Sequence, residues 1–423
     1  MLVNNGMNVS SEHLRLALPL AESLLPKGWL EKQKSRTPND LLLTTSLRLF
    51  SPKQIDQILR EGFHPRDQMH PMAEAVLGAQ RVLEFEARTG NFLCDLFAYR
   101  LLALAEVAKN IKKIQRGKER LDRLLDEQWR PALYELLVAC SQSTVGAVEM
   151  IAETVDPTPD MKLANSIYLE CKARSEYEGN VRDFITRVQR LALDRIFSEC
   201  RNIGDGLQIE IDVHNHSGII EIPAMLRAMF SEKGTKKISA YITIKVVPYH
   251  PGPHRLPRPM KAFSSELWRW LMGFENWRDW HLVQPYGEFE IENYSNMITS
   301  VVKRPVLVCI RSIPLSKSVP NISTTVKKAC GQLKNHQPGI VRMLVRSDLY
   351  GIGQNAAPHK IKADLDAIAH DLLRQYSRLD GVRFDIVTPP LPGEMHGEYT
   401  FSAAARANSA AEIMTYAPGV FLI

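Results

Sequence analysis

A short strand-like segment carrying two opposite charges sets the main limit on how this chain folds. Ile167–Ala173 has a strand pattern, and within it Glu170 and Lys172 stand two positions apart. Side chains at that spacing point to the same face of a sheet. Asp160 lies ten residues before Glu170, and a hairpin turning around Asn165-Ser166 would bring the two together. The pattern therefore predicts two carboxylates and one ammonium at one spot on a sheet edge.

These three groups suit metal-assisted hydrolysis of a phosphodiester. Mg²⁺ and similar hard ions prefer carboxylate oxygens and keep several waters. The metal lowers the pKa of a bound water, and a lysine beside it can orient that water and stabilise the charge that develops. The backbone carbonyl of Cys171 is a further candidate ligand. The competing interpretation is a solvent-facing pair, Glu170 and Lys172, on an edge strand.

The segments around these residues alternate between helix and strand patterns. We expect a helix at Leu133–Cys140, a strand at Val148–Ile151, a helix over Asn180–Ser198 and an alternating strand at Leu207–Val213. With the hairpin, these segments predict a mixed α/β core that spans residues 129–215.

Asp160 with Glu170-Cys171-Lys172 resembles the PD-(D/E)xK nuclease superfamily, which includes restriction endonucleases and repair nucleases. Glu135 matches the acidic residue that many members carry on the helix before the first core strand, and Gln189 matches, more weakly, a polar residue on the later helix. The resemblance covers about 85 residues. It implies a restriction-endonuclease-like mixed sheet.

The resemblance also implies roles for single residues. Asp160 and Glu170 would bind Mg²⁺ or Mn²⁺, Lys172 would position the attacking water, and Glu135 would complete the metal shell or hold a water in it. Arg174, two positions beyond Lys172, would meet the scissile or a neighbouring phosphate; a plain surface role is the alternative.

The remainder of the chain divides into three further regions. Residues 1–128 show helical periodicity, and residues 216–300 form an insertion or linker that contains the cluster Trp268, Trp270, Trp277 and Trp280. Residues 301–423 alternate strands and helices, which predicts an α/β region. This last region is either a separate domain or a continuation of the nuclease sheet, and we favour the continuation.

Composition limits the cellular setting and the partners. The chain has 423 residues, 45% of them hydrophobic, and a formal net charge of +6, which is compatible with a polyanionic partner. Lys109–Arg123 is densely basic, so Lys112, Lys113 and Arg116 are candidate phosphate contacts; a solvated helix face is the alternative. Six cysteines without a CxxC pair indicate a reduced, cytoplasmic protein. No apolar run is long enough to span a membrane.

Weaker signals do not change this interpretation. His214-Asn215-His216 lacks a third metal ligand nearby in sequence, and the tryptophan cluster fits helix packing better than contact with bases. We expect a Mg²⁺-dependent DNA endonuclease that acts in restriction or phage defence, and the resemblance is compatible with a homodimer, since two copies of the core would cut both strands. The alternatives are an RNase and a catalytically silent binding protein or scaffold on the same fold.

Overall fold

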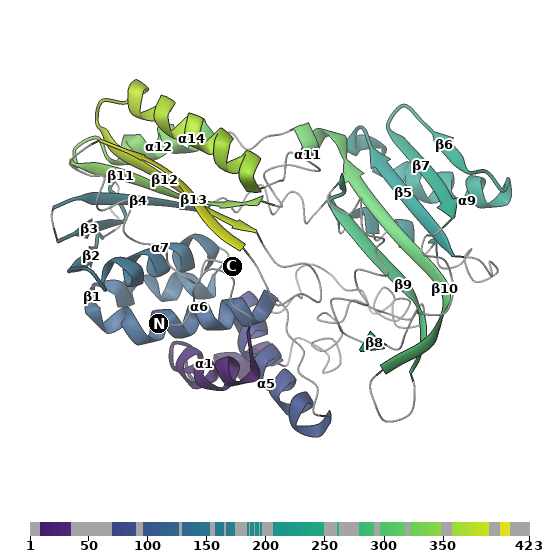
Figure 1. The fold of residues 1–423 in the computed structure, drawn as a ribbon, viewed down its shortest axis with the longest axis horizontal. Coiled ribbons are helices and arrows are strands. Elements are labelled where there is room, and N and C mark those ends of the chain that lie inside the picture. Colours follow the sequence, from purple (N-terminus) through teal and green to yellow (C-terminus); the bar gives the residue numbers. More distant parts are fainter. Residues whose placement is uncertain are drawn as a thin grey trace.

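The structure is a computed structural model, and it describes residues 9–34, 70–89, 96–126, 129–152, 157–164, 166–173, 184–185, 187–189, 191–193, 195–196, 206–248, 260–261, 279–291, 297–317, 322–347, 358–388 and 398–406. These residues form two sheets with helices packed against them (Figure 1). The expected mixed α/β class is confirmed. None of the helices in these ranges combines the length and apolar character needed to cross a membrane.

The first sheet has seven strands in the order β1-β2-β3-β4-β11-β12-β13. β2, β3 and β4 form an antiparallel meander, and β11 and β12 follow in parallel beside β4. The strands span Ile114–Gln115, Val148–Met150, Met161–Leu163, Tyr168–Ala173, Gly339–Arg346, Leu379–Thr388 and Glu398–Ala405. β4 is therefore an interior strand. The interpretation of Glu170 and Lys172 as a pair on an edge strand is wrong, and so is the expectation that the three charged groups lie on a sheet edge.

Helices cover both faces of the first sheet (Figure 1). One face packs against α7 (Trp129–Gln142), which lies on α6 (Leu96–Asn110). α5 (Pro71–Thr89) and α1 (Ser11–Ser23) pack on α6, and α2 (Trp29–Lys34) packs on α5. The other face packs against α12 (Ile322–Gln332) and α14 (Pro358–Gln375). α7 is buried along most of its length, because its own residues are apolar on nearly every side of the helix.

One carboxylate, that of Asp385, accepts the hydrogen bonds of a largely buried polar network in this sheet. Asp385 on β12 accepts hydrogen bonds from Arg342 (Nε, 2.5 Å) and Arg383 (Nε, 2.8 Å). It also accepts from Tyr134 of α7 at 2.8 Å and from Tyr399 at 2.7 Å. The two guanidinium groups hold the pKa of Asp385 at about 2 despite its burial. The network therefore links α7 to three strands of the sheet.

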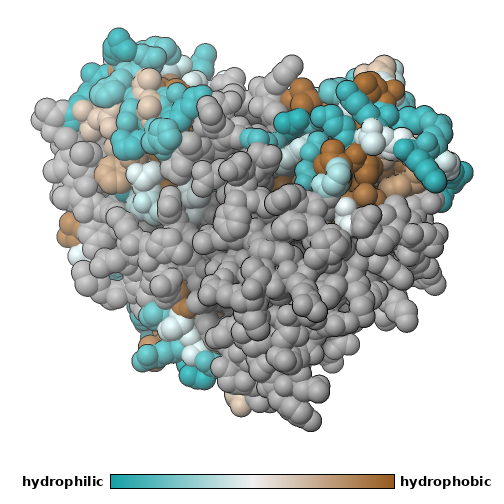
Figure 2. All heavy atoms as spheres, turned by 45° about the vertical axis from the view of Figure 1, so that its right-hand side comes forward, coloured by the Kyte–Doolittle hydropathy of each residue, from teal (hydrophilic) through white to brown (hydrophobic). Residues whose placement is uncertain are grey.

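The second sheet is built from the segment between β4 and α12. Its order is β6-β7-β5-β10-β8, and β9 pairs with β10. The strands β5 to β10 span Leu207–Val213, Lys236–Ile238, Ile242–Pro248, Met260–Lys261, Leu282–Ile291 and Met297–Ser312. η5 (His216–Glu221), α9 (Ile222–Ser231) and α11 (Ile313–Lys317) accompany it. Apolar side chains reach the surface in this part (Figure 2), among them Ile220 and Ile238.

The sheets divide the chain differently from the expected regions. β5 was expected inside the 129–215 core, but it pairs with β7 and β10 in the second sheet. The strand beside β4 is β11, in which Val341 lies opposite Glu170. β1 places part of the 1–128 region in the first sheet as well. Buried strands have similar local patterns, so their partners depend on tertiary packing that the sequence pattern does not encode.

Candidate active site

The hairpin of β3 and β4 builds the site. Met161 lies opposite Leu169, so Asp160, just before β3, comes beside Glu170. The hairpin closes where the Leu163 N–H donates to the Ile167 carbonyl at 2.9 Å. The juxtaposition that the spacing predicts is therefore present in the structure.

Just before β3 begins, a side chain takes the place of the main-chain pairing with β4. The Cys171 N–H donates to Asp160 Oδ2 at 2.7 Å. This bond fixes one oxygen of the carboxylate against β4. The Cys171 side chain itself is buried, and the role of its carbonyl as a ligand stays a prediction.

Glu170 is the most enclosed charged group of the site. Its side chain is 0% exposed, and Oε1 accepts a hydrogen bond from Nζ of Lys172, whose side chain is 27% exposed. The second oxygen, Oε2, is buried and has no hydrogen-bond partner among the residues that the structure describes. A buried carboxylate oxygen without a partner is costly, because the group has lost its water and gained nothing in exchange.

Burial and mutual repulsion shift the ionisation of these carboxyl groups. Burial, together with the negative charge of Asp160, raises the pKa of Glu170 to about 9. Burial also raises the pKa of Asp160, although Lys172 and the Cys171 N–H oppose the shift. Burial lowers the pKa of Lys172, but the carboxylates of Glu170 and Asp160 outweigh it, and the net shift is upward. Two negative charges side by side in this buried place are thus unfavourable, and a bound proton or metal ion can neutralise them.

The residues fit a hard divalent ion. Asp160 and Glu170 offer adjacent carboxylates. Glu170 Oε2 accepts no hydrogen bond from the described residues, so it is available to coordinate a cation. Within the described ranges, no three His, Cys, Asp or Glu side chains gather closely enough to form a complete protein cage. Mg²⁺ is commonly held by one or two carboxylates with water in the other positions, so two acidic side chains suffice.

Glu135 approaches the site from α7 but is bound to two arginines. Its Oε2 lies 3.3 Å from Nη1 of Arg123 and 3.9 Å from Nε of Arg120. Burial and the charge of Asp160 raise its pKa to about 8, while the arginines oppose that shift. Glu135 is therefore within electrostatic reach of Asp160. In the sequence, Arg120 and Arg123 are only two members of a basic run, and nothing in that run indicates their pairing with Glu135.

The other expected site residues are scattered. Arg174 lies outside the described residues. Gln189 belongs to a helical segment whose Phe184 and Val188 pack in the core of the second sheet, and its place beside Asp160 and Glu170 stays a prediction. Helix packing decides this position, and the motif spacing carries no information about it.

The basic residues lie along the β1 edge of the first sheet. Lys112, Lys113 and Arg116 are exposed on the segment that enters and leaves β1. Lys113 donates to Asn110 at 3.0 Å, and Arg116 pairs with Glu119 at 2.9 Å. The segment after Arg116 turns towards the end of β2, which is also the end of the sheet where Asp160 lies.

A second polar cluster forms at the end of β5 and β10. His216 Nε2 lies 2.8 Å from the hydroxyl of buried Ser312, and the Ser312 N–H donates to Nδ1 of His281. His214 pairs instead with the Thr243 hydroxyl at 2.9 Å. Both His214 and His216 thus have protein partners, in keeping with a structural role.

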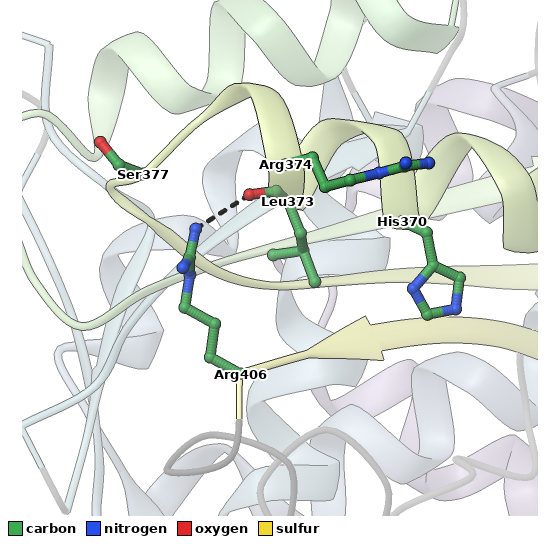
Figure 3. A pocket seen from close by; sticks show the side chains of 5 residues that line it. All are labelled: His370, Leu373, Arg374, Ser377 and Arg406. Atoms are coloured by element: carbon green, nitrogen blue, oxygen red, sulfur yellow. Dashed lines mark hydrogen bonds between the residues drawn. The ribbon is translucent and has the colours of Figure 1, made fainter.

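Two further features lie away from the carboxylates. Trp280 carries the guanidinium of Arg311 over its ring at 4.7 Å, whereas Trp268, Trp270 and Trp277 fall outside the described residues. A pocket of about 570 Å³ sits at the end of α14 (Figure 3), lined by His370, Leu373, Arg374, Ser377 and Arg406. Arg406 donates there to the Leu373 carbonyl at 2.9 Å, so it caps the helix end.

Comparison with protein-family models, with curated proteins and with solved structures found no match. The chemistry of the site is therefore inferred from its own residues.

Proposed function

We propose that this chain is a metal-dependent phosphodiester hydrolase that cuts nucleic acid, with DNA as the favoured substrate. The observation that carries the proposal is the buried, unpaired Oε2 of Glu170 beside Asp160 and Lys172. The hydrogen bond from Lys172 occupies only Oε1, and the other polar group beside Glu170 is the carboxyl group of Asp160, so the two acidic side chains together offer oxygens to a ligand.

The roles follow from where each group lies. Asp160 and Glu170 would hold Mg²⁺ or Mn²⁺. Such an ion, when bound, supplies Lewis-acid activation of water and neutralises charge on the phosphate. Lys172 is partly exposed and fully charged at neutral pH, so its ammonium can donate to the attacking water or to a phosphate oxygen. The Cys171 N–H holds Asp160 in place throughout.

The exposed cations of the β1 edge support a nucleic-acid substrate. Lys112, Lys113 and Arg116 would track phosphates beside the cleavage site. A second copy of the chain would allow both strands of a duplex to be cut. Cytoplasmic action in restriction or phage defence remains part of the same proposal.

A cleavage assay with matched variants tests the chemistry. Wild type, Lys172→Ala, Glu170→Gln and Lys162→Ala would be incubated with supercoiled plasmid, linear duplex or RNA, in Mg²⁺, Mn²⁺ or EDTA. Lys162 is the control, because it is a lysine of the neighbouring strand that lies over the Tyr168 ring instead. We expect cleavage by wild type and Lys162→Ala, and losses of about 10²-fold or more in the other two variants.

The outcomes separate the alternatives. Cleavage that EDTA abolishes and that prefers RNA would change the substrate to RNA but keep the site. Equal cleavage by wild type and Lys172→Ala would overturn the assignment of the site. Retained DNA binding without cleavage by any protein would favour a silent binding platform.

A further inference from the structure

Glu135 is a carboxylate near the proposed metal site, and its charge is already paired with two arginines. Its Oε2 is shared by Arg120 and Arg123, from the short helical turns η3 (Gly117–Arg120) and η4 (Asp122–Leu125). Arg120 and Glu135 are both nearly buried, with side chains 6% exposed. For Oε2 of Glu135 to bind a metal, it would have to leave two guanidinium groups, and that of Arg120 is in a place where water can hardly replace it.

Arg120 connects this ion pair to Asp160 through the main chain. Its Nη2 donates to the carbonyl of Ile151, the residue just after β2, at 3.0 Å. The N–H of Ile151 in turn donates to the carbonyl of Asp160 at 2.9 Å. The Asp160 carboxylate is then held from the other side by the Cys171 N–H. Glu135, Arg120 and Ile151 thus form a continuous chain of contacts that ends on the backbone of Asp160, one of the proposed metal ligands.

The formal charges indicate how many ions this site takes. Three carboxylates, on Glu135, Asp160 and Glu170, face three cations, on Arg120, Arg123 and Lys172, so the ionised cluster sums to zero. One divalent ion gives a charge of +2. A phosphodiester and an attacking hydroxide, each of charge −1, cancel it. A second divalent ion would leave an excess of +2 in a largely buried site, which is costly.

We propose, resting on the function proposed above, that Glu135 and Arg120 are positioning residues and that the site takes a single divalent ion. Glu135 holds Arg120, and Arg120 holds the end of β2 and so the backbone of Asp160. The ion is bound by Asp160 and Glu170, without Glu135.

Direct Mn²⁺ binding tests this inference without relying on cleavage. Calorimetric titration of the full chain is expected to give one ion per chain for wild type and for Glu135→Gln, whose amide oxygen can still accept from the arginines. Glu170→Gln is expected to lose most of the affinity, because it removes a ligand.

Arg120→Ala separates positioning from simple electrostatics. Removing a cation near a metal site, and so releasing Glu135, strengthens metal binding if charge alone matters. If Arg120 positions Asp160, the affinity falls instead, by about 10- to 100-fold as for other outer-shell partners. Arg123→Ala is the matched control, since it removes the same charge from Glu135 but leaves the hydrogen bond to Ile151; its affinity is expected to equal or exceed that of wild type.

The results that overturn the inference are distinct from failure of the function. Two ions per wild-type chain, loss of binding in Glu135→Gln as in Glu170→Gln, or tighter binding by a folded Arg120→Ala would each refute it. If circular dichroism shows that Arg120→Ala does not fold, Arg120→Lys serves, with weakened binding again expected because a lysine cannot reach both partners at once. A wild type that binds no Mn²⁺ overturns the proposed function and this inference together.

Discussion

Without a bound metal, the protein is expected to become less stable as the pH rises from 6 to 8. Glu170 has a pKa of about 9 in the folded chain, well above the ordinary value of about 4.3 that it takes when unfolded. Across this window the folded state therefore keeps a proton that the unfolded state has lost. Stability falls by about 1.4 kcal/mol per pH unit for each such proton, or about 2.7 kcal/mol between pH 6 and pH 8.

Urea unfolding in EDTA at several pH values measures this slope. Glu170→Gln removes the titrating group, so its free energy of unfolding should fall less steeply than that of wild type by about 1.4 kcal/mol per pH unit. Glu149→Gln on β2 is the control, and it should keep the wild-type slope. Mn²⁺ should restore wild-type stability most strongly at the higher pH, because the ion replaces the retained protons.

Wild-type stability that stays level or rises over this window would refute the argument, as would equal slopes for wild type and Glu170→Gln. Either result would mean that Glu170 is ionised in the folded metal-free chain and that its buried charge is compensated by another group.

Two further outcomes are expected. Asp385→Asn should lower the free energy of unfolding by about 3–5 kcal/mol in urea titrations, because Arg342 and Arg383 would lose their shared buried counter-charge. A loss below about 1 kcal/mol would contradict the assigned network. Alanine at Lys112 or Lys113 should reduce the slope of log affinity for duplex DNA against log salt by about 0.9 for each phosphate contact removed, and an unchanged slope would place the DNA elsewhere.

The sequence was most informative where the relevant residues are close together in the chain. Asp160 and Glu170 belong to one hairpin, so turn and strand patterns sufficed to bring them together. The later elements were predicted nearly as well, since the alternation of helices and strands expected for residues 301–423 is present in α12, β11, α14 and β12. Local periodicity fixes such elements because it reflects one buried face.

Contacts between segments far apart in the chain could not be predicted from these local patterns. Nothing in the pattern of Leu207–Val213 distinguishes a partner of β4 from a member of another sheet, because both environments bury the same apolar positions. The ion pair of Glu135 with Arg120 and Arg123 was missed for a related reason. Its geometry depends on how the turns after β1 fold back over α7, and a run of basic residues does not encode that path.

The separation of β4 from β11 has a consequence for synthesis on the ribosome. Glu170 pairs in register with Val341, which is translated 171 residues later. At synthesis rates of about 5–20 residues per second, that interval is roughly ten to thirty seconds. Until then β4 is the last strand of an incomplete sheet, and Glu170 lacks the neighbour that completes its enclosure. A chain released before Val341 is made would carry the acidic hairpin without the strand beside it, so the cell would meet the assembled centre only after β11 has been translated.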